Sequence, residues 1–325
     1  ASGAPAPAAV KAAEAAFSRL SKSADGALRQ ITAAGNAGAT SPASNAELRL
    51  LVGVKLTAFL ELAIFDVTLG RWAAAGAKLD ELASFMAVFI RHAAHFAPCF
   101  HAVTAALAIV LGDVAAADGH IAALRDAGGG DAAAHAFVFT CFRAHAVGDR
   151  QRLAALIDAY ALADTSAGRK SSRTETPAHR GSATVNGADD DDATAGALTV
   201  AGFEALQRSP RLLLLVRLLQ GASQVLNHDW RTATTTLKAV ANDARNSFGV
   251  ASPVVGCSLR LLADAQVRSG GSSSSSEAAL TMATQIADRS GHALGVAQCV
   301  AWTVGRIEVA SSGDSERLPG LLNKP

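Results

Sequence analysis

The residues best suited to chemistry lie in one short segment, HAAHFAPCFH. It supplies His92, His95, Cys99 and His101, whose nitrogen and sulfur atoms are ligands that Zn²⁺ accepts. Pro98 favours the start of a new helix inside the segment, which would spread the four side chains around a turn. No second ligand cluster supports a metal site. We therefore expect no metal, and interpret the segment as a His-rich helix end whose imidazoles interact favourably with the helix dipole.

Sequence motifs for catalysis or phosphate binding are also missing. The chain has no G-x-S-x-G elbow, Walker loop or H-E-x-x-H motif, and its glycine-rich segments at 128 and 270 follow predicted helices rather than strands. The GRKSS segment at 168–172 lacks the upstream glycine of a phosphate loop and lies inside the predicted insert. Arg169, Lys170 and Arg173 could mark a nuclear-import or phosphate-contact patch, but we favour a soluble linker. The acidic run 189–192 has no fixed geometry for acid–base catalysis. We expect neither enzyme activity nor a cofactor.

The composition predicts a helical protein. Of 325 residues, 50% are hydrophobic but only 5% are aromatic, so alanine fills much of the core. Alanine-rich chains with few aromatic residues favour closely packed helices over sheets. A net charge of +1 gives no electrostatic argument for nucleic acid or an anionic membrane as the main partner. With no window of roughly 20 uninterrupted apolar residues, we expect a soluble, all-α protein without a membrane segment.

The cysteines favour a reducing compartment. Cys99, Cys141, Cys257 and Cys299 are far apart and each lies within an apolar helical pattern, so we expect buried free thiols. The chain has no Asn-x-Ser/Thr sequon, and its first residues lack both an initiator Met and an apolar signal core. We interpret it as either a processed chain or a fragment of a longer one.

The segment 209–245 is the template for the fold. Ser209 can cap a first helix whose residues 212–219 are apolar nearly all round, and a second helix follows the turn at Asn227. Such a pair must bury its faces against neighbours of the same kind. Turns recur at intervals of about 40 residues, except where one interval contains an insert, at Gly70, Gly112, Gly148, Asn227, Gly270 and Gly313.

The domain boundaries follow from these turns and from shifts in composition. We expect a loosely ordered lead-in over 1–43, helical pairs over 44–164, a disordered Ser/Thr/Asp-rich insert over 165–197, further pairs over 198–313, and a tail over 314–325. The period is nearest to HEAT or armadillo lengths, but the internal pattern is typical of tetratricopeptide (TPR) repeats. The predicted fold is a right-handed superhelix, or solenoid, of TPR-like antiparallel helix pairs.

Small residues recur where the helices of a pair should cross. They would let the two backbones approach, and one aliphatic residue would fill the groove between pairs. The predicted helix-packing residues are Ala63, Ala75, Ala105, Ala117, Gly221, Ala233 and Leu237.

A solenoid presents a long groove that suits an extended peptide or a helix of another protein. In the template pair, the less apolar positions Gln220, Gln224, Arg231 and Lys238 are the candidate partner-binding residues. Trp72, Trp230 and Trp302 lie near turns, where we expect core filling more than contact with a partner.

The last two pairs resemble the C-terminal repeats of the chromatid cohesion factor of the Mau-two type, the TPR subunit of the cohesin loader. The likeness is confined mainly to 209–308, and the serine tract 272–276, the insert and the spacing of Trp302 depart from the family pattern. The matching positions are Gly221, Ala233, Leu237, Lys238, Cys257, Ser258, Leu259, Leu261, Leu262, Met282, Ala283, Gln285, Ala287 and Gln298.

This resemblance implies a nuclear, non-enzymatic adaptor. Its superhelix would wrap an extended segment of the large HEAT-repeat loader subunit and support cohesin loading and sister chromatid cohesion, without sequence-specific binding to nucleic acid. The alternatives are another TPR scaffold, such as an anaphase-promoting-complex subunit or a regulator's sensor domain, and a small-molecule sensor with a closed polar pocket.

Overall fold

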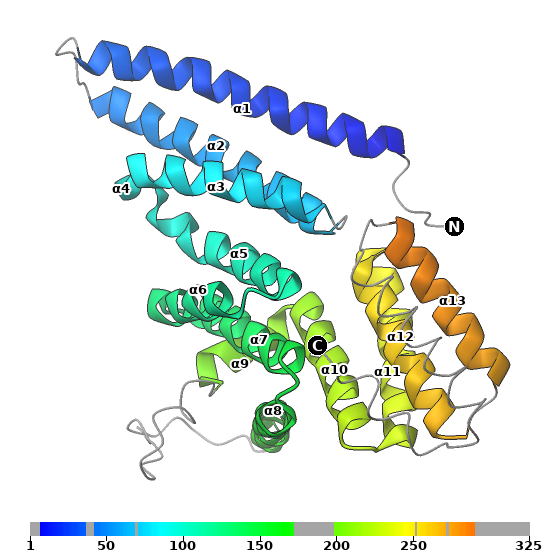
Figure 1. The fold of residues 1–325 in the computed structure, drawn as a ribbon. Coiled ribbons are helices and arrows are strands. Elements are labelled where there is room, and N and C mark those ends of the chain that lie inside the picture. Colours follow the sequence, from blue (N-terminus) through cyan, green and yellow to red (C-terminus); the bar gives the residue numbers. More distant parts are fainter. Residues whose placement is uncertain are drawn as a thin grey trace.

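The computed structural model describes residues 7–36, 42–68, 71–171, 198–250, 252–270 and 273–289. Every regular element in these ranges is a helix, which confirms the predicted all-α class (Figure 1). The elements are α1 (Pro7–Asn36), α2 (Pro42–Thr68), α3 (Trp72–Val88), α4 (Ile90–Ala93), the 3₁₀ turn η1 (Ala94–Phe96), α5 (Ala97–Leu111), α6 (Val114–Ala127), α7 (Gly130–Ala146), α8 (Arg150–Ser171), α9 (Val200–Arg208), α10 (Pro210–Leu226), α11 (Trp230–Phe248), α12 (Pro253–Arg268) and α13 (Ser273–Arg289).

Helices that are neighbours in the chain are mostly neighbours in space. Contacts join α1 to α2, α2 to α3, α5 to α6, and α10 through α11 and α12 to α13. A second set of contacts joins α3 to α5, α5 to α7, α7 to α10 and α10 to α12. Figure 1 shows the helices in layers that follow the sequence from α1 to α13. Each helix thus buries its apolar side mainly against helices close to it in sequence.

The turns between paired helices share one backbone device. Gly112 and Gly148 have φ values of 77° and 74°, and each is followed by an aspartate that accepts a hydrogen bond from a backbone N–H of the next helix. His228 takes the same place before Asp229, with a φ of 64°. The predicted turn at Asn227 is present, and its left-handed residue is the next one, His228. The predicted turns at Gly70 and Gly313 lie outside the described residues.

The template pair forms as predicted. The Ser209 hydroxyl accepts from the Leu212 N–H, and Pro210 occupies the first turn of α10, where its missing donor costs nothing. A Cβ placed on Gly221 would lie 2.6 Å from Cδ2 of Leu237, so α10 and α11 approach closely at this glycine. All of the predicted packing residues are buried: Ala63, Ala75, Ala105, Ala117, Gly221, Ala233 and Leu237.

The N-terminal segment differs from its prediction. Residues 7–36 form the long helix α1 instead of a loosely ordered lead-in, and α1 packs along α2. Its buried apolar contribution is small, chiefly Ala24 and Leu28. Ion pairs supplement it, because Asp25 contacts Lys55 of α2 and Glu14 contacts Arg71 before α3. An apolar pattern this sparse gave little sign of a packed helix.

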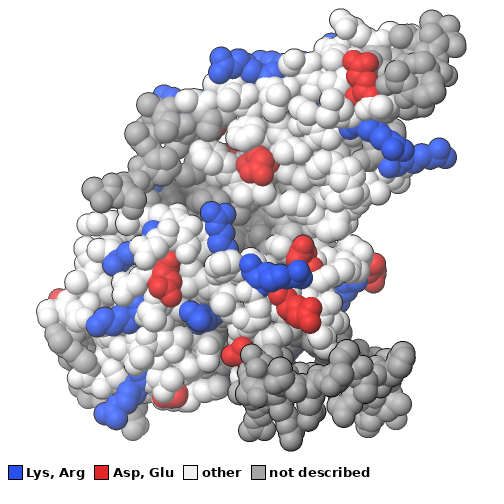
Figure 2. All heavy atoms as spheres, turned by 180° about the vertical axis from the view of Figure 1, so that it is seen from behind, with Lys and Arg blue, Asp and Glu red and all other residues white. Residues whose placement is uncertain are grey.

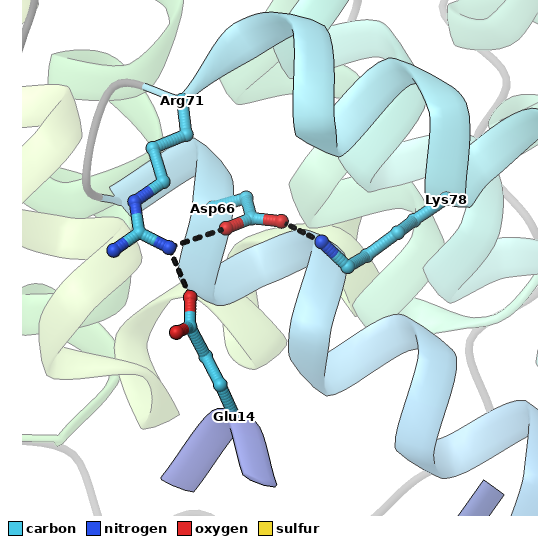
Figure 3. A network of polar contacts seen from close by, with 4 residues as sticks. All are labelled: Glu14, Asp66, Arg71 and Lys78. Carbon is cyan, nitrogen blue, oxygen red and sulfur yellow. Dashed lines mark hydrogen bonds and ion pairs between the residues drawn. The ribbon is translucent and has the colours of Figure 1, made fainter. Parts of the chain in front are cut away.

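Figure 3 shows that Arg71 belongs to a network of charged side chains. Arg71 lies 3.5 Å from Asp66 of α2, and the other oxygen of Asp66 contacts Lys78 of α3. The Asp66 side chain is only 2% exposed, so both cations compensate a buried carboxylate. The network fixes α2 against α3 and connects both to Glu14 of α1.

The boundaries of the predicted insert also shift. Helix α8 continues to Ser171, past the expected boundary at 165, and the predicted final helix after residue 290 lies outside the described residues. After the insert, α9 returns to pack on α7. A Cβ on Gly202 would lie 3.0 Å from the Ala133 Cβ, which shows how closely these helices approach.

One stretch in the described ranges, Ala94–Leu111, has the length and apolar composition of a membrane span. It covers η1 and α5, and α5 contacts α2, α3, α6 and α7. Only 28% of the stretch is buried, and one such helix is weak evidence for a membrane segment, because core helices of soluble proteins can have the same composition.

Candidate partner-binding site

The described side chains of the His-rich segment do not gather around one point. Among the described side chains, no three or more His, Cys, Asp or Glu residues come together in a way that could hold an ion. His95 stacks near Phe96, with ring centroids 4.1 Å apart, and Cys99 is exposed. Nothing is described for the His92 side chain. The segment spans the junction of α4, η1 and α5, and α5 begins at Ala97, next to the predicted start at Pro98.

The cysteines agree only in part with the expectation of burial. Cys141 is fully buried, and burial raises its pKa to about 12. Cys257 is half-buried, whereas Cys99 is exposed, so the prediction of a buried thiol is wrong there. Partial desolvation and the nearby Glu61 nonetheless raise the pKa of Cys99, which makes its thiolate scarce at neutral pH. Cys299 lies outside the described residues.

His101 instead turns toward His120 on the next helix. The two Nδ1 atoms are 2.9 Å apart, and the Phe100 ring meets both imidazoles edge-on. Burial lowers the pKa of both histidines, and their mutual repulsion lowers that of His101 further. Both rings are therefore neutral at pH 7, and one Nδ1–H donates to the other Nδ1.

The four predicted partner-binding residues fall on two surfaces. Gln220 and Gln224 lie one helical turn apart on α10 and are half-buried. Arg231 and Lys238 are exposed on α11, opposite its buried residues. The structure therefore brings together the two glutamines, but does not bring them together with the two basic residues.

The glutamines share their face of α10 with Arg217, at spacings of three and four residues. Arg217 lies 3.9 Å from Asp243 of α11. Its positive charge also acts on Tyr160 of α8, where it lowers the pKa and partly offsets the larger effects that raise it. This face of α10 thus lies along a seam between α8 and α11. We call Arg217, Gln220 and Gln224 the α10 polar row.

Further polar side chains border the α10 polar row. Gln207 of α9 donates to the Tyr160 hydroxyl at 3.3 Å and to Asp164 at 3.2 Å. Burial, followed by the charge of Asp164, raises the pKa of Tyr160, so the phenol stays protonated and available as a donor at neutral pH. This seam therefore offers both hydrogen-bond donors and hydrogen-bond acceptors.

Buried polar atoms without a hydrogen-bond partner occur on three helices of the inner set of contacts. Within the described residues, they are Arg143 Nε and His145 Nδ1 on α7, Gln224 Oε1 on α10, and Gln266 Oε1 on α12. These three helices contact one another in order. An unpaired buried donor or acceptor costs about 1–3 kcal/mol, so four of them along one set of helices call for an explanation.

Among these four residues, His145 has a strongly lowered pKa. Burial, together with the positive charge of Arg260 on α12, lowers its pKa to about 4. Its imidazole is therefore neutral at physiological pH. The sequence analysis did not single out Arg143, His145 or Gln266; the only signal was a polar residue within an otherwise apolar helical pattern.

The tryptophans agree with core filling where they are described. Trp72 and Trp230 both pack against buried cores. Trp230 is also covered by Arg268, whose guanidinium carbon lies 4.9 Å from the ring centroid. Trp302 lies outside the described residues.

Charges on the surface are mixed. On the face seen in Figure 2, Lys and Arg are interspersed with Asp and Glu among uncharged residues. A protein that binds mainly to phosphate backbones gathers its basic residues on one face. The face seen in Figure 2 does not show such a concentration of basic residues.

Comparisons with known proteins add no relative: no protein-family model matches the chain, and neither does any curated protein or solved structure.

Proposed function

We propose that this chain is a non-enzymatic adaptor, a TPR-like right-handed solenoid of helix pairs that binds an extended segment of another protein. The recurrent turn, a left-handed residue followed by a capping aspartate at 112–113, 148–149 and 228–229, supports the repeat. The contacts from α5 through α7 and α10 to α12 support a continuous inner layer.

The observation that carries this proposal is the set of buried polar atoms without partners on α7, α10 and α12. An extended peptide has one N–H donor and one C=O acceptor at nearly every residue. If these side chains turned outward on binding, such a segment would donate to Gln224 and Gln266 and accept from Arg143. Binding would thereby recover the cost of desolvating these groups, which a smooth apolar groove could not do.

The identity of the partner rests on the resemblance in residues 209–308. We propose the large HEAT-repeat subunit of the cohesin loader, with a role in cohesin loading and sister chromatid cohesion in the nucleus. Of the matching positions, Gly221, Ala233 and Leu237 meet at the crossing of α10 and α11, so their part is to hold the pair together. The α10 polar row and the exposed Arg231 and Lys238 are the proposed contacts.

A pull-down from nuclear extract with the complete chain, analysed by mass spectrometry, tests this function. We expect recovery of the large loader subunit, reduced by Gln224→Ala and unchanged by Gln151→Ala, a matched change at an exposed glutamine of α8. Recovery of a different protein in a stable complex would support another TPR scaffold. Failure to recover any cohesin-loading component would refute the proposed partner.

A further inference from the structure

We propose that α1 is a displaceable helix, and that the face of α2 beneath it is a docking site for an amphipathic helix of another protein that brings a carboxylate to Lys55. In this arrangement α1 occupies the site from within the chain and regulates access to it. Figure 1 shows α1 at the end of the stack of helices, where it lies along α2. This docking site is separate from the α10 polar row and does not depend on the partner proposed for that row.

The apolar attachment of α1 is small. Leu28 is the one residue of α1, among its described side chains, that belongs to the core cluster shared by α2, α3 and α5. Ser21 and Ala24 are also buried but are small, whereas Leu20 is 46% exposed. Every other buried member of that cluster comes from helices α2 to α5, so α1 can leave while the cluster keeps most of its packing.

Two ion pairs supplement this attachment. Asp25 contacts Lys55 of α2, and Glu14 contacts Arg71 before α3. The Arg71 and Glu14 side chains are 42% and 33% exposed, so water and salt screen the second pair. The Lys55 side chain is only 9% exposed, and screening acts less on its contact with Asp25. The pair between Asp25 and Lys55 is therefore the main electrostatic attachment of α1.

The surroundings of Lys55 make this face selective for a carboxylate. Its Nζ lies 4.5 Å from the ring centroid of Phe85 and 5.4 Å from that of Phe59. The two rings favour a cation but do not neutralise it, and a buried ammonium without a counter-charge is costly. A helix that covers this face must therefore bring a carboxylate to Lys55 and an apolar residue to the core, as α1 does with Asp25 and Leu28.

A helix of another protein with this pattern would bind by laying its apolar side on α2, a common way of recognising helices. It would compete with α1, which the chain holds close to the site. Its apparent affinity is therefore lowered by the fraction of molecules in which α1 has left α2. Any change that weakens the contact between Asp25 and Lys55 should increase this fraction and open the site.

Hydrogen exchange of the complete native chain tests the displacement of α1. We expect the amides at 21–28 to exchange together, at least about tenfold faster than those at 52–59 of α2, and faster still as salt rises from about 0.05 to 0.5 M. Asp25→Asn should speed exchange at 21–28 by at least about tenfold, the value of a hydrogen bond between charged groups. Asp80→Asn, at an exposed aspartate of α3, is the matched control and should leave it unchanged. Exchange at 21–28 as slow as at 52–59, or indifferent to both salt and Asp25→Asn, would overturn the proposal.

A labelled peptide of residues 7–36 serves as the probe for the docking site, because it has the required pattern. In fluorescence anisotropy it should bind the Asp25→Asn chain at least about tenfold more tightly than the native chain, in which α1 competes better. A peptide that itself carries Asp25→Asn should bind at least about tenfold more weakly than the native peptide. Circular dichroism would establish that each chain is folded. No saturable binding to either chain, or equal binding of both peptides, would contradict the proposed site.

Light scattering of the complete chain without peptide identifies the natural occupant. We expect a monomer for both the native chain and Asp25→Asn, which leaves the face to a helix of another protein. Dimers that increase with Asp25→Asn would show that the face takes α1 of a second copy, and would overturn its assignment to another protein.

Discussion

Gly221 offers the sharpest test of helix packing in the template pair. In Gly221→Ala, the new Cβ would lie 2.6 Å from Cδ2 and 2.7 Å from Cγ of Leu237. Contacts this short require one of the two groups to move. Leu237 is completely buried, and the clash includes the branching atom Cγ, so turning the tip of the side chain does not relieve it.

The magnitude follows from two opposing effects. Replacing glycine by alanine in a helix interior ordinarily stabilises a protein by about 1 kcal/mol. Overpacking a filled core costs about 1–3 kcal/mol. We expect the clash to win, because the contacts are well inside van der Waals distance, and Gly221→Ala to lower the free energy of unfolding by about 1 kcal/mol. Gly221→Leu should lower it by more than about 2 kcal/mol.

Gly119→Ala is the matched control. Gly119 lies in α6, and a Cβ there would meet nothing within 4 Å, so this change should stabilise the protein by about 0.5–1 kcal/mol. Urea unfolding followed by circular dichroism measures both. The double variant Gly221→Ala/Leu237→Ala should lose less stability than the two single changes added together, since the clashing atoms are gone. If Gly221→Ala stabilised the protein as much as Gly119→Ala does, the close approach of α10 and α11 would be disproved.

Three further predictions concern backbone strain, pH and buried charge. His228→Gly should raise the free energy of unfolding by about 1 kcal/mol in urea titrations, because glycine adopts positive φ without strain; Asn227→Gly, at an ordinary φ of −90°, should not. His145 has a folded-state pKa of about 4, below its unfolded value. Its contribution to the free energy of unfolding should therefore be fully present above about pH 6.5 and fall by at most about 3 kcal/mol toward pH 4. Thermal unfolding across this range should show a smaller decline in His145→Gln, and an equal decline would contradict the assignment. Asp66→Asn should lower the free energy of unfolding by about 2 kcal/mol, because two cations lose a buried partner. Glu14→Gln, at the more exposed end of the network, should lower it by less than about 1 kcal/mol. Similar losses for both variants would show that burial of Asp66 does not matter.

The helical pairs could be predicted because their signals are local. Apolar spacing, the Ser209 cap and the glycine turns act within a few residues, and they indicated α10 and α11 closely. Helix α1 could not be predicted as packed, because ion pairs to residues far along the chain supplement its two main apolar contacts. The turn at Asn227 was predicted, but its left-handed residue His228 was not, because neither residue has the clear signal of a glycine.

The candidate sites were harder to predict than the helices. Gln220 and Gln224 could be selected as polar positions on an apolar helix, but whether they meet Arg231 depends on how helices pack around them. The contact between His101 and His120 joins residues nineteen positions apart across a turn, and no spacing rule within one helix predicts it. Whether such residues meet depends on how each helix is rotated about its own axis, and this rotation is set by packing in the core.

The most direct measurement of the central proposal is a fluorescence-anisotropy titration of the complete chain against overlapping peptides that tile the N-terminal segment of the large loader subunit. We predict that one window binds saturably at a one-to-one ratio, and that Gln224→Ala weakens its Kd by about tenfold, the value of one buried hydrogen bond. Absence of binding by every window, or binding that is indifferent to Gln224, would contradict the account.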